Sequence, residues 1–221
     1  MNNPFTSIAI ADDSEMFRYV MKKIISDTSD FKITIEAGDG KELIEKFEKS
    51  FLMPKICILD IGMPVMDGYA TIKVLTKRWP YVKVLVLSHY YHEYAIGSMI
   101  QMGAKGFISK EENPECIVEA LISLKEDQYY YSKYVNKEMF AQANKGKMNL
   151  PTFTSVEKRL LGMFCTDLQY SEIAEMLFIS KHTIEKHKQN ISRKTGIHSR
   201  EGLMLFAIQN DLSGIHSNPL S

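Results

Sequence analysis

The sequence predicts an α/β domain built on a doubly wound parallel sheet, followed by a smaller all-α domain of four helices. Over residues 1–125, five short β-rich runs alternate with five amphipathic helical stretches. From Phe153 onward, every periodic stretch is helical. The chain has 221 residues, enough for two domains of ordinary size. We therefore divide it into a first domain (1–125), a linker (126–151) and a second domain (152–221).

Each strand of the first domain is expected to lead into a helix. The expected strands are Ser7–Ala11, Lys32–Ala37, Ile56–Leu59, Lys83–Leu87 and Gly106–Ile108. The expected helices are Glu15–Ser26, Lys41–Ser50, Tyr69–Arg78, Glu93–Met102 and Pro114–Lys125. Residues 56–59 and 84–87 are apolar throughout, which is typical of central strands covered by helices on both faces. Capping signals agree, because Asp39 and Glu42 have the spacing of a capping box and Asn113-Pro114 supplies an N-cap and a first-turn proline.

The pattern breaks over residues 126–151. A run of tyrosines (129–131), expected to pack on one of the domains, precedes a polar, helix-compatible piece, Tyr134–Asn144. Beyond it, capping residues predict four helices. The first starts after Thr154, which forms a capping box with Glu157, and ends near Cys165. The others run from after Ser171 to about Phe178, from after Ser180 to about Thr195 and from after Ser199 to about Gln209. The second and third lie close together, which suggests a helix-turn-helix.

The charge distribution is local rather than global. Formal net charge is zero, so no overall basic field indicates a nucleic-acid partner. Residues 181–200, however, carry six Lys/Arg against one acid, Glu185, whereas residues 1–125 carry 15 basic and 17 acidic side chains. The three cysteines have no metal-binding spacing and are expected to be buried free thiols. We find neither a signal peptide nor an apolar run long enough to span a membrane, and expect a cytoplasmic protein.

Chemistry-bearing residues follow four of the expected strands. Ligands of doubly wound sheets bind at the carboxyl ends of the strands, where this sequence places Asp12-Asp13, Asp60, Ser88 and Lys110. Three clustered carboxylates repel one another and need a cation, and oxygen ligands suit Mg²⁺. A carboxylate can accept a phosphoryl group covalently. A lysine and a metal ion would then stabilise the phosphoryl oxygens, and a serine hydroxyl could donate to one of them.

These residues resemble the receiver domain of bacterial response regulators, which has a flavodoxin-like fold. The resemblance covers about residues 5–125 and is carried by the segments Ile10-Ala-Asp-Asp13, Leu59-Asp-Ile-Gly-Met-Pro-Val-Met-Asp-Gly68, Leu87-Ser88 and Gly103-Ala-Lys-Gly-Phe-Ile-Ser-Lys110. It implies that a sensor histidine kinase phosphorylates Asp60 and that Lys110 contacts the phosphoryl group. It also implies a Mg²⁺ site. The direct ligands would be Asp13, Asp60 and the backbone carbonyl of Gly62, and Asp12 would hold a water that is bound to the metal ion.

The resemblance also implies a switch. In the family, a hydroxyl at the position of Ser88 shifts on phosphorylation, and an aromatic residue at the position of Phe107 rotates inward. Many receivers have tyrosine where this chain has Phe107, which can rotate but cannot make the phenol hydrogen bond. Gly62 and Tyr90 hold positions thought to tune dephosphorylation.

Three other functions use similar features. A haloacid-dehalogenase-type phosphatase requires a second aspartate two residues after the nucleophile, where this chain has Gly62. A flavodoxin-like electron carrier requires a phosphate loop after the first strand, where Asp12 and Asp13 would repel a flavin phosphate. An interaction module regulated without phosphate remains open, although the intact set of acids and lysine disfavours it.

The third helix of the second domain has a polar, mostly basic face made of His182, Glu185, Lys186, Gln189 and Arg193. Such a face suits a reader of the DNA major groove. The segments Phe153-Thr-Ser-Val-Glu157, Ser171-Glu-Ile-Ala174, Leu177-Phe-Ile-Ser180, Thr183-Ile-Glu-Lys-His187 and Lys194-Thr-Gly196 are similar to the LuxR-type helix-turn-helix. Joined to a receiver, they make the chain resemble a NarL/FixJ-type response regulator.

This second resemblance implies DNA contacts from the third helix. Lys186 and Gln189 are the best candidates for base contacts, whereas Thr183, Lys188, Arg193 and Lys194 are expected to contact phosphates or to be structural. Glu185 either accepts a hydrogen bond from a cytosine or forms a salt bridge with Lys186 or Lys188. One such domain makes few base contacts, so we expect a homodimer on double-stranded promoter DNA. We do not expect an enzyme.

Overall fold

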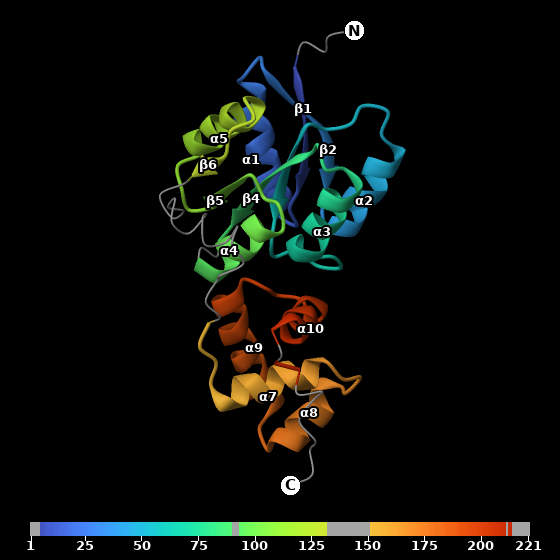
Figure 1. Cartoon of the computed structure of the whole chain (residues 1–221), viewed down its shortest axis with the longest axis vertical. Helices are drawn as coiled ribbons and strands as arrows, with labels where there is room; N and C mark the ends of the chain where they lie inside the picture. The colour runs from blue at the N-terminus through green and yellow to red at the C-terminus, as the bar shows by residue number, and fades with distance from the viewer. Residues whose placement is uncertain (1–4, 90–92, 132–150, 211, 214–221) are drawn as a thin grey trace.

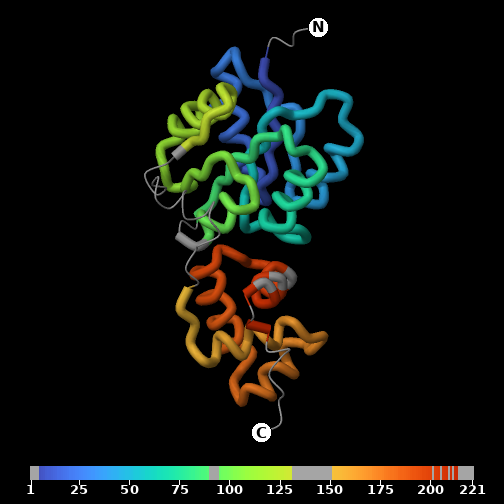
Figure 2. Tube along the Cα trace, in the orientation of Figure 1, coloured from blue at the N-terminus to red at the C-terminus, as the bar shows by residue number. Residues whose placement is uncertain are grey.

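The computed structural model describes residues 5–89, 93–131, 151–210 and 212–213. It contains an α/β body and a smaller helical body that lies beside helices α3 and α4 of the first (Figures 1 and 2). The linker piece Tyr134–Asn144 and Tyr90 lie outside the described residues.

The first body is built on a parallel sheet in the strand order β2-β1-β3-β4-β5-β6. Its strands are β1 (Thr6–Ala11), β2 (Phe31–Ala37), β3 (Ile56–Asp60), β4 (Lys83–Ser88), β5 (Gly106–Ser109) and β6 (Tyr130–Tyr131). The first five are the predicted strands, each longer by one residue at one end. The doubly wound α/β fold is confirmed.

Helices cover both faces of this sheet. They are α1 (Glu15–Ser26), α2 (Gly40–Lys49), α3 (Gly68–Arg78), α4 (Glu93–Gln101) and α5 (Glu115–Lys125). One buried cluster joins α1 and α5 to Ile8, Ile58 and Leu85, while another joins α2, α3 and α4 to Ala9, Cys57 and similar residues. Alternate residues of each strand thus face opposite layers, which explains why the central strands are apolar at every position.

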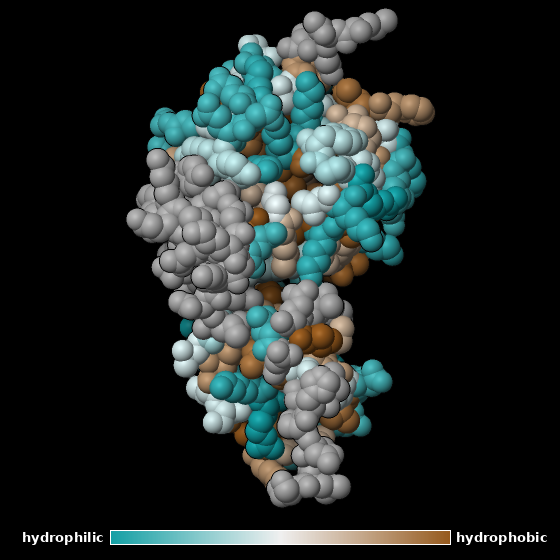
Figure 3. All heavy atoms as spheres, in the orientation of Figure 1, coloured by the Kyte–Doolittle hydropathy of each residue, from teal (hydrophilic) through white to brown (hydrophobic). Residues whose placement is uncertain are grey.

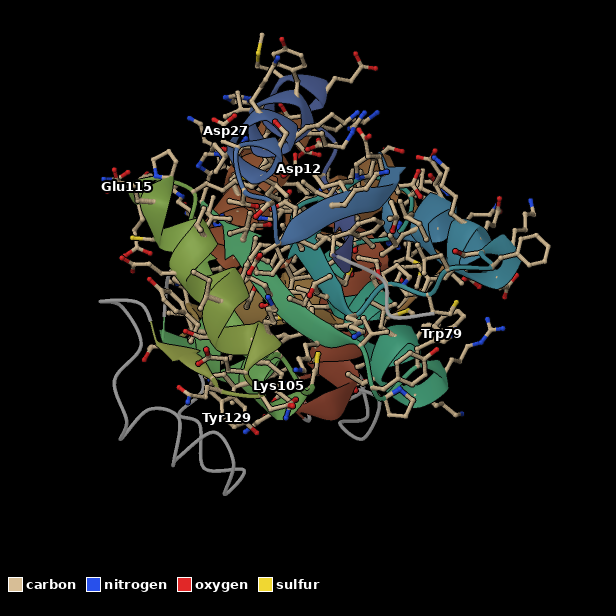
Figure 4. The ribbon with its side chains drawn as sticks, turned by 90° about the horizontal axis from the view of Figure 1, so that it is seen from above. Asp12, Asp27, Trp79, Lys105, Glu115 and Tyr129 are labelled. Carbon is tan, nitrogen blue, oxygen red and sulfur yellow. The ribbon has the colours of Figure 1, made fainter. Side chains whose placement is uncertain are left out.

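The sixth strand extends the sheet into the segment expected to be linker. Tyr130 and Tyr131 pair in parallel with Gly106 and Phe107 at the edge of β5. Beside them, Lys105 Nζ donates to the hydroxyl of Tyr129 at 2.8 Å and lies 4.5 Å from its ring centre (Figure 4). The tyrosine run therefore packs on the first domain and covers an edge strand whose backbone groups would otherwise be unpaired.

The second body contains the four predicted helices, α7 (Ser155–Phe164), α8 (Tyr170–Leu177), α9 (Lys181–Thr195) and α10 (Arg200–Gln209). The predicted capping box of Thr154 and Glu157 is present, and Ser180 and Ser199 cap α9 and α10. The prediction that Ser171 caps α8 is wrong. The helix begins two residues earlier than predicted, with Gln169 as its N-cap, because the carboxylate of Glu172 accepts from the Gln169 backbone N–H at 2.6 Å.

Two caps in the first body differ in detail from the prediction. Asp39 caps α2, but the carboxylate of Glu42 accepts from the backbone N–H of Gly38 rather than from that of Asp39. Helix α5 begins at Glu115, one residue after Pro114.

Among the described residues, no helix has both the length and the apolar character that a membrane crossing requires. Hydrophilic residues cover much of the α/β body on the face shown in Figure 3.

Candidate functional site

The carboxyl ends of β1 and β3 bring three aspartates together. Ala11 pairs with Leu59, so Asp12 and Asp60 follow on adjacent strands. The nearest carboxylate oxygens of Asp12, Asp13 and Asp60 all lie within 4.8 Å of one another. Asp12 and Asp60 are 1% and 6% exposed, whereas Asp13 is exposed to solvent. The structure thus brings together the acids that the strand ends predicted.

Lys110 supplies a buried positive charge to this cluster. Its Nζ lies 2.7 Å from Asp12 Oδ2 and 3.1 Å from Asp60 Oδ1, and its side chain is 5% exposed. The Lys110 backbone N–H donates to the carbonyl of Ser88 at 2.9 Å, which ties the end of β5 to β4. A buried ammonium shared by two carboxylates offsets part of their desolvation and repulsion.

The electrostatics of Asp60 favour a bound cation. Burial raises its pKa above the ordinary carboxyl value, the charge of Lys110 opposes this shift, and the charge of Asp12 adds to it. Three carboxylates face one lysine here, so the cluster retains negative charge when all are ionised. The cluster is an acidic pocket compatible with Mg²⁺, because that ion prefers oxygen ligands.

The two expected switch residues are both buried. Ser88 ends β4, the strand next to that of Asp60, and is 1% exposed. Phe107 is also 1% exposed and packs in the cluster that contains Val86 and Met99. The Phe107 ring therefore lies inside the fold.

A cavity of about 250 Å³ opens beside Asp60. It is lined by Asp13, Ser14, Asp60, Gly62, His89, Lys110 and His198. Gly62 borders it closely, since a Cβ atom at that position would lie 3.4 Å from Cδ2 of His198 and 3.9 Å from Asp60 Oδ2. Six of the seven residues belong to the first domain, but His198 comes from the turn between α9 and α10 of the second.

Hydrogen bonds attach this turn to the start of α3. Tyr69 donates its hydroxyl hydrogen to the carbonyl of Thr195 at 2.7 Å. Ser199, the N-cap of α10, donates its hydroxyl hydrogen to Asp67 Oδ2 at 2.5 Å. The other oxygen of Asp67 caps α3 by accepting from the Ala70 backbone N–H. Two helix N-caps, one from each domain, are thus hydrogen-bonded to each other.

The expected DNA-contacting residues lie along α9. Lys186 and Gln189 are exposed, as base contacts require. Glu185 lies 3.9 Å from Lys188, which favours the salt bridge over the cytosine contact in this structure. A second cavity has a volume of about 390 Å³. It is lined by Glu185, Lys188, Gln189, Ser192, Arg193 and His198.

Other candidates on α9 make local bonds. Thr183 lies in the first turn, where its hydroxyl is 2.8 Å from that of Ser180. Arg193 donates to the side-chain oxygen of Asn190 at 2.6 Å. Lys194 donates to the carboxylate of Glu157 at 2.6 Å and to the carbonyl of Thr152 at 3.0 Å, so its role in this structure is to tie α9 to α7.

Family models match both domains. The model described as the response regulator receiver domain matches residues 8–122, and that of the luxR family of bacterial regulatory proteins matches residues 151–207. The chain is a NarL/FixJ-type response regulator. It is therefore a DNA-binding protein of a two-component system, in a family of transcription regulators.

Relatives of this response regulator match it over nearly their full length. The transcriptional regulatory protein DegU of Brevibacillus brevis is 27% identical, with 95% of this chain and 96% of DegU covered. The fimbriae Z protein of Escherichia coli is 29% identical, with 91% and 96% covered. RcsB of Salmonella enterica serovar Typhimurium, solved bound to a promoter with a phosphomimetic, has a TM-score of 0.61 at 22% identity, with 92% and 98% covered, and shares the fold.

Two histidines of the response regulator's pocket are missing from the residues that the sequence predicted. His89 directly follows Ser88, so a search of strand ends extended by one residue would have found it. His198 lies in a polar turn of the other domain, and only the packing of the two domains brings it to Asp60.

Proposed function

We propose that a sensor histidine kinase phosphorylates Asp60 and thereby controls the binding of this response regulator to promoter DNA. The observation that carries the proposal is the buried cluster of an acceptor carboxylate, two further acids and the Lys110 ammonium. Catalysis of phosphoryl transfer requires little beyond positioning and charge stabilisation, and this cluster offers both.

In the proposed reaction, a carboxylate oxygen of Asp60 attacks the phosphorus of a phosphohistidine. The new O–P bond forms as the donor's P–N bond breaks, and the electron pair of that bond returns to the imidazole of the donor. Lys110 would hold a phosphoryl oxygen, and the hydroxyl of Ser88 would donate to another. Asp12, Asp13, Asp60 and the carbonyl of Gly62 would hold Mg²⁺, which supplies neutralising charge for the phosphoryl oxygens when bound.

Helix α9 would read the major groove, with Lys186 and Gln189 on base edges and Thr183, Lys188 and Arg193 near phosphates. Glu185 would orient Lys188, as its 3.9 Å approach suggests. Two copies would bind paired half-sites, which supplies the affinity that one recognition helix lacks.

We place the receiver at residues 1–125, the linker at 126–151 and the DNA-binding domain at 152–221, although β6 lies within that linker. Each chain would take one phosphoryl group as a signal rather than turn over a substrate, so we propose no enzymatic role. Because bacterial promoters lie in the cytoplasm, we place the protein there.

Incubation with Mg²⁺ and acetyl phosphate, followed by intact-protein mass spectrometry, tests the acceptor. The wild-type chain should gain the mass of one phosphoryl group, and Asp60→Asn should gain none. Asp167→Asn, which changes an exposed aspartate of the other domain, should behave as wild type. A phosphoryl gain that persists in Asp60→Asn, or no gain in the wild type, would overturn the proposal and favour a module regulated without phosphate.

A further inference from the structure

The Lys110 ammonium has an aromatic neighbour that the predicted site residues do not include. The face of the Phe17 ring, on α1, is turned to this ammonium, and Nζ lies 4.7 Å from the ring centre. An aromatic ring attracts a cation within about 6 Å of its centre. The carboxylates of Asp12 and Asp60 contact the same ammonium at 2.7 and 3.1 Å. Two acids and one aromatic ring therefore surround Nζ.

The position of Phe17 is fixed by the start of α1 and by the core. Its backbone N–H donates to Oγ of Ser14, the N-cap of the helix, at 3.2 Å. Its side chain is half-buried and packs on the cluster that contains Ile10 and Ile108. These two residues lie two positions before Asp12 and Lys110 on their strands. The ring is thus anchored next to the strand ends that form the site.

The same turn of α1 also holds Asp12. Its Oδ1 accepts from the Ser14 backbone N–H at 2.9 Å, and Nη1 of Arg18 donates to its backbone carbonyl at 2.5 Å. The other carboxylate oxygen, Oδ2, contacts Lys110. Helix α1 therefore positions both a carboxylate that pairs with the ammonium and the ring that lies against it.

Of these neighbours, only the ring keeps its role when Asp60 accepts a phosphoryl group. The Asp60 carboxylate becomes the acceptor, and Asp12 is an expected partner of the metal ion, so the charges of both acids are engaged elsewhere. The ring of Phe17 binds neither group. Lysine has a long, flexible stem, and its ammonium stabilises charge best when it is in place before the reaction. A neutral ring can hold the ammonium throughout.

We propose that Phe17 is a positioning residue for the phosphorylation of Asp60, because its ring face holds the Lys110 ammonium beside the acceptor. This inference rests on the proposed function and adds a residue of α1 to the acceptor site. The ring acts through the negative charge of its face. A ring that only filled space could be replaced by another apolar side chain of similar size.

Fluorination of the ring tests this role with almost no change in shape, because fluorine withdraws electrons from the ring face. Phenylalanines with increasing numbers of fluorine atoms are introduced at Phe17 of the full-length protein. Intact-protein mass spectrometry measures the rate of phosphoryl gain from acetyl phosphate and Mg²⁺. The rate should fall stepwise, by about 2- to 30-fold in all, which is the fold-change equivalent to a cation–π attraction.

Phe31 provides the matched control for this series. Its ring also has a lysine nearby, with Lys125 Nζ 5.7 Å from the ring centre, but it lies on β2 and outside the cavity beside Asp60. The same fluorinated residues at Phe31 should leave the rate unchanged. A rate that stays constant along the Phe17 series overturns the inference, because the ring would then act through its volume alone.

Two ordinary substitutions extend the test. Phe17→Tyr keeps an aromatic face and should phosphorylate at nearly the wild-type rate, whereas Phe17→Leu should be at least as slow as the most fluorinated protein. Tyr19→Leu removes an exposed aromatic ring from the same helix and should have no effect. Equal rates of Phe17→Leu and Phe17→Tyr would contradict the proposed role of the ring face.

A further measurement detects the contact without phosphate. The ε-methylene groups of the lysines are labelled with carbon-13, and the NMR signal of Lys110 is assigned with Lys110→Arg. Protons over a ring face are shifted upfield, so this signal should lie upfield of those of exposed lysines and move back toward them in Phe17→Leu. A Lys110 signal that is the same in both proteins overturns the inference. If the contact is present but even the wild-type chain gains no phosphoryl group, the proposed function fails, and with it the role of Phe17 in phosphorylation.

Discussion

Asp13 differs from Asp12 and Asp60 because it is exposed to solvent, whereas the other two carboxylates are paired with the Lys110 ammonium. A cation at the cluster should therefore gain most from Asp13. At a Mg²⁺ concentration ten times its dissociation constant, we expect stabilisation of the receiver by about 1.4 kcal/mol. In Asp13→Asn, most of this stabilisation should disappear at the same Mg²⁺ concentration.

Urea unfolding of the full chain, followed by the fluorescence of Trp79, measures this effect. Trp79 is the single tryptophan of the sequence and follows α3, so its signal reports the receiver. Asp167→Asn provides the control, because it removes an exposed carboxylate far along the chain from the cluster. Equal stabilisation of Asp13→Asn and wild type by Mg²⁺ would place the ion elsewhere.

At the same scale, the residues that could be predicted are those fixed by the order of the strands. Asp12, Asp60 and Lys110 follow parallel strands, and parallel strands end at one edge of a sheet. The position of His198 depends on which faces of two domains meet, and no local pattern encodes that. Phe107 was predicted as a rotating residue, but its burial depends on packing that the sequence does not display.

Helices α7 and α9 are joined by one partly buried ion pair. Burial would raise the pKa of Glu157, but hydrogen bonds from Lys194 and the Thr154 backbone, together with the charge of Lys194, lower it below its ordinary value. A carboxyl group whose pKa falls on folding stabilises the fold above its unfolded pKa and loses that contribution as pH falls. Glu157→Gln should therefore destabilise the DNA-binding domain by about 2 kcal/mol at pH 7, and the difference from wild type should shrink below pH 4.5.

Circular dichroism detects this loss of stability, because the helices of both domains contribute to its signal. The fluorescence of Trp79, in contrast, reports the receiver. Glu157→Gln should shift the dichroism transition in urea and leave the midpoint of the fluorescence transition in place. Glu175→Gln, an exposed position on α8, gives the same chemical change without the ion pair and should shift neither. A difference from wild type that stays constant between pH 7 and pH 4 would contradict the assignment of the effect to the carboxylate.

At the scale of elements, periodicity and capping predicted all nine main helices of the described segments to within about a residue or two at either end. The wrong cap at Ser171 has a local cause. Glutamine rarely caps helices, whereas serine often does. The preferences of the residue types therefore favoured Ser171 over Gln169 as the N-cap. Strand β6 was missed because two tyrosines are too short a run to show alternation, and the strand forms only by pairing with β5.

At the scale of the molecule, the two domains share one apolar core cluster. It runs from Val86 and Ile96 in the receiver to Ile197, Ile191 and Leu203 in the DNA-binding domain. The sequence predicted both domains but left open whether they inhibit each other. Their contact buries polar groups that are matched to each other, such as Asp67 and Ser199, and this matching is typical of a specific interface.

DNA binding should require an intact reading face on α9. In the phosphorylated protein, Lys186→Ala combined with Gln189→Ala should reduce affinity for a duplex selected from a random library by the phosphorylated wild-type protein. The reduction should be at least about tenfold, since good base contacts are worth about 1–3 kcal/mol each. Affinity for unrelated DNA should fall much less, because phosphate contacts dominate nonspecific binding.

Lys158→Ala on α7 removes one exposed lysine outside α9 and should leave the preference for the selected duplex intact. Phosphorylation of Asp60 should be unaffected in each of these variants, because none of these residues lines its cavity. Fluorescence anisotropy at a fixed salt concentration measures the two affinities. If the double variant keeps its preference for the selected duplex, α9 does not read the bases, even where the receiver responds to phosphate as proposed.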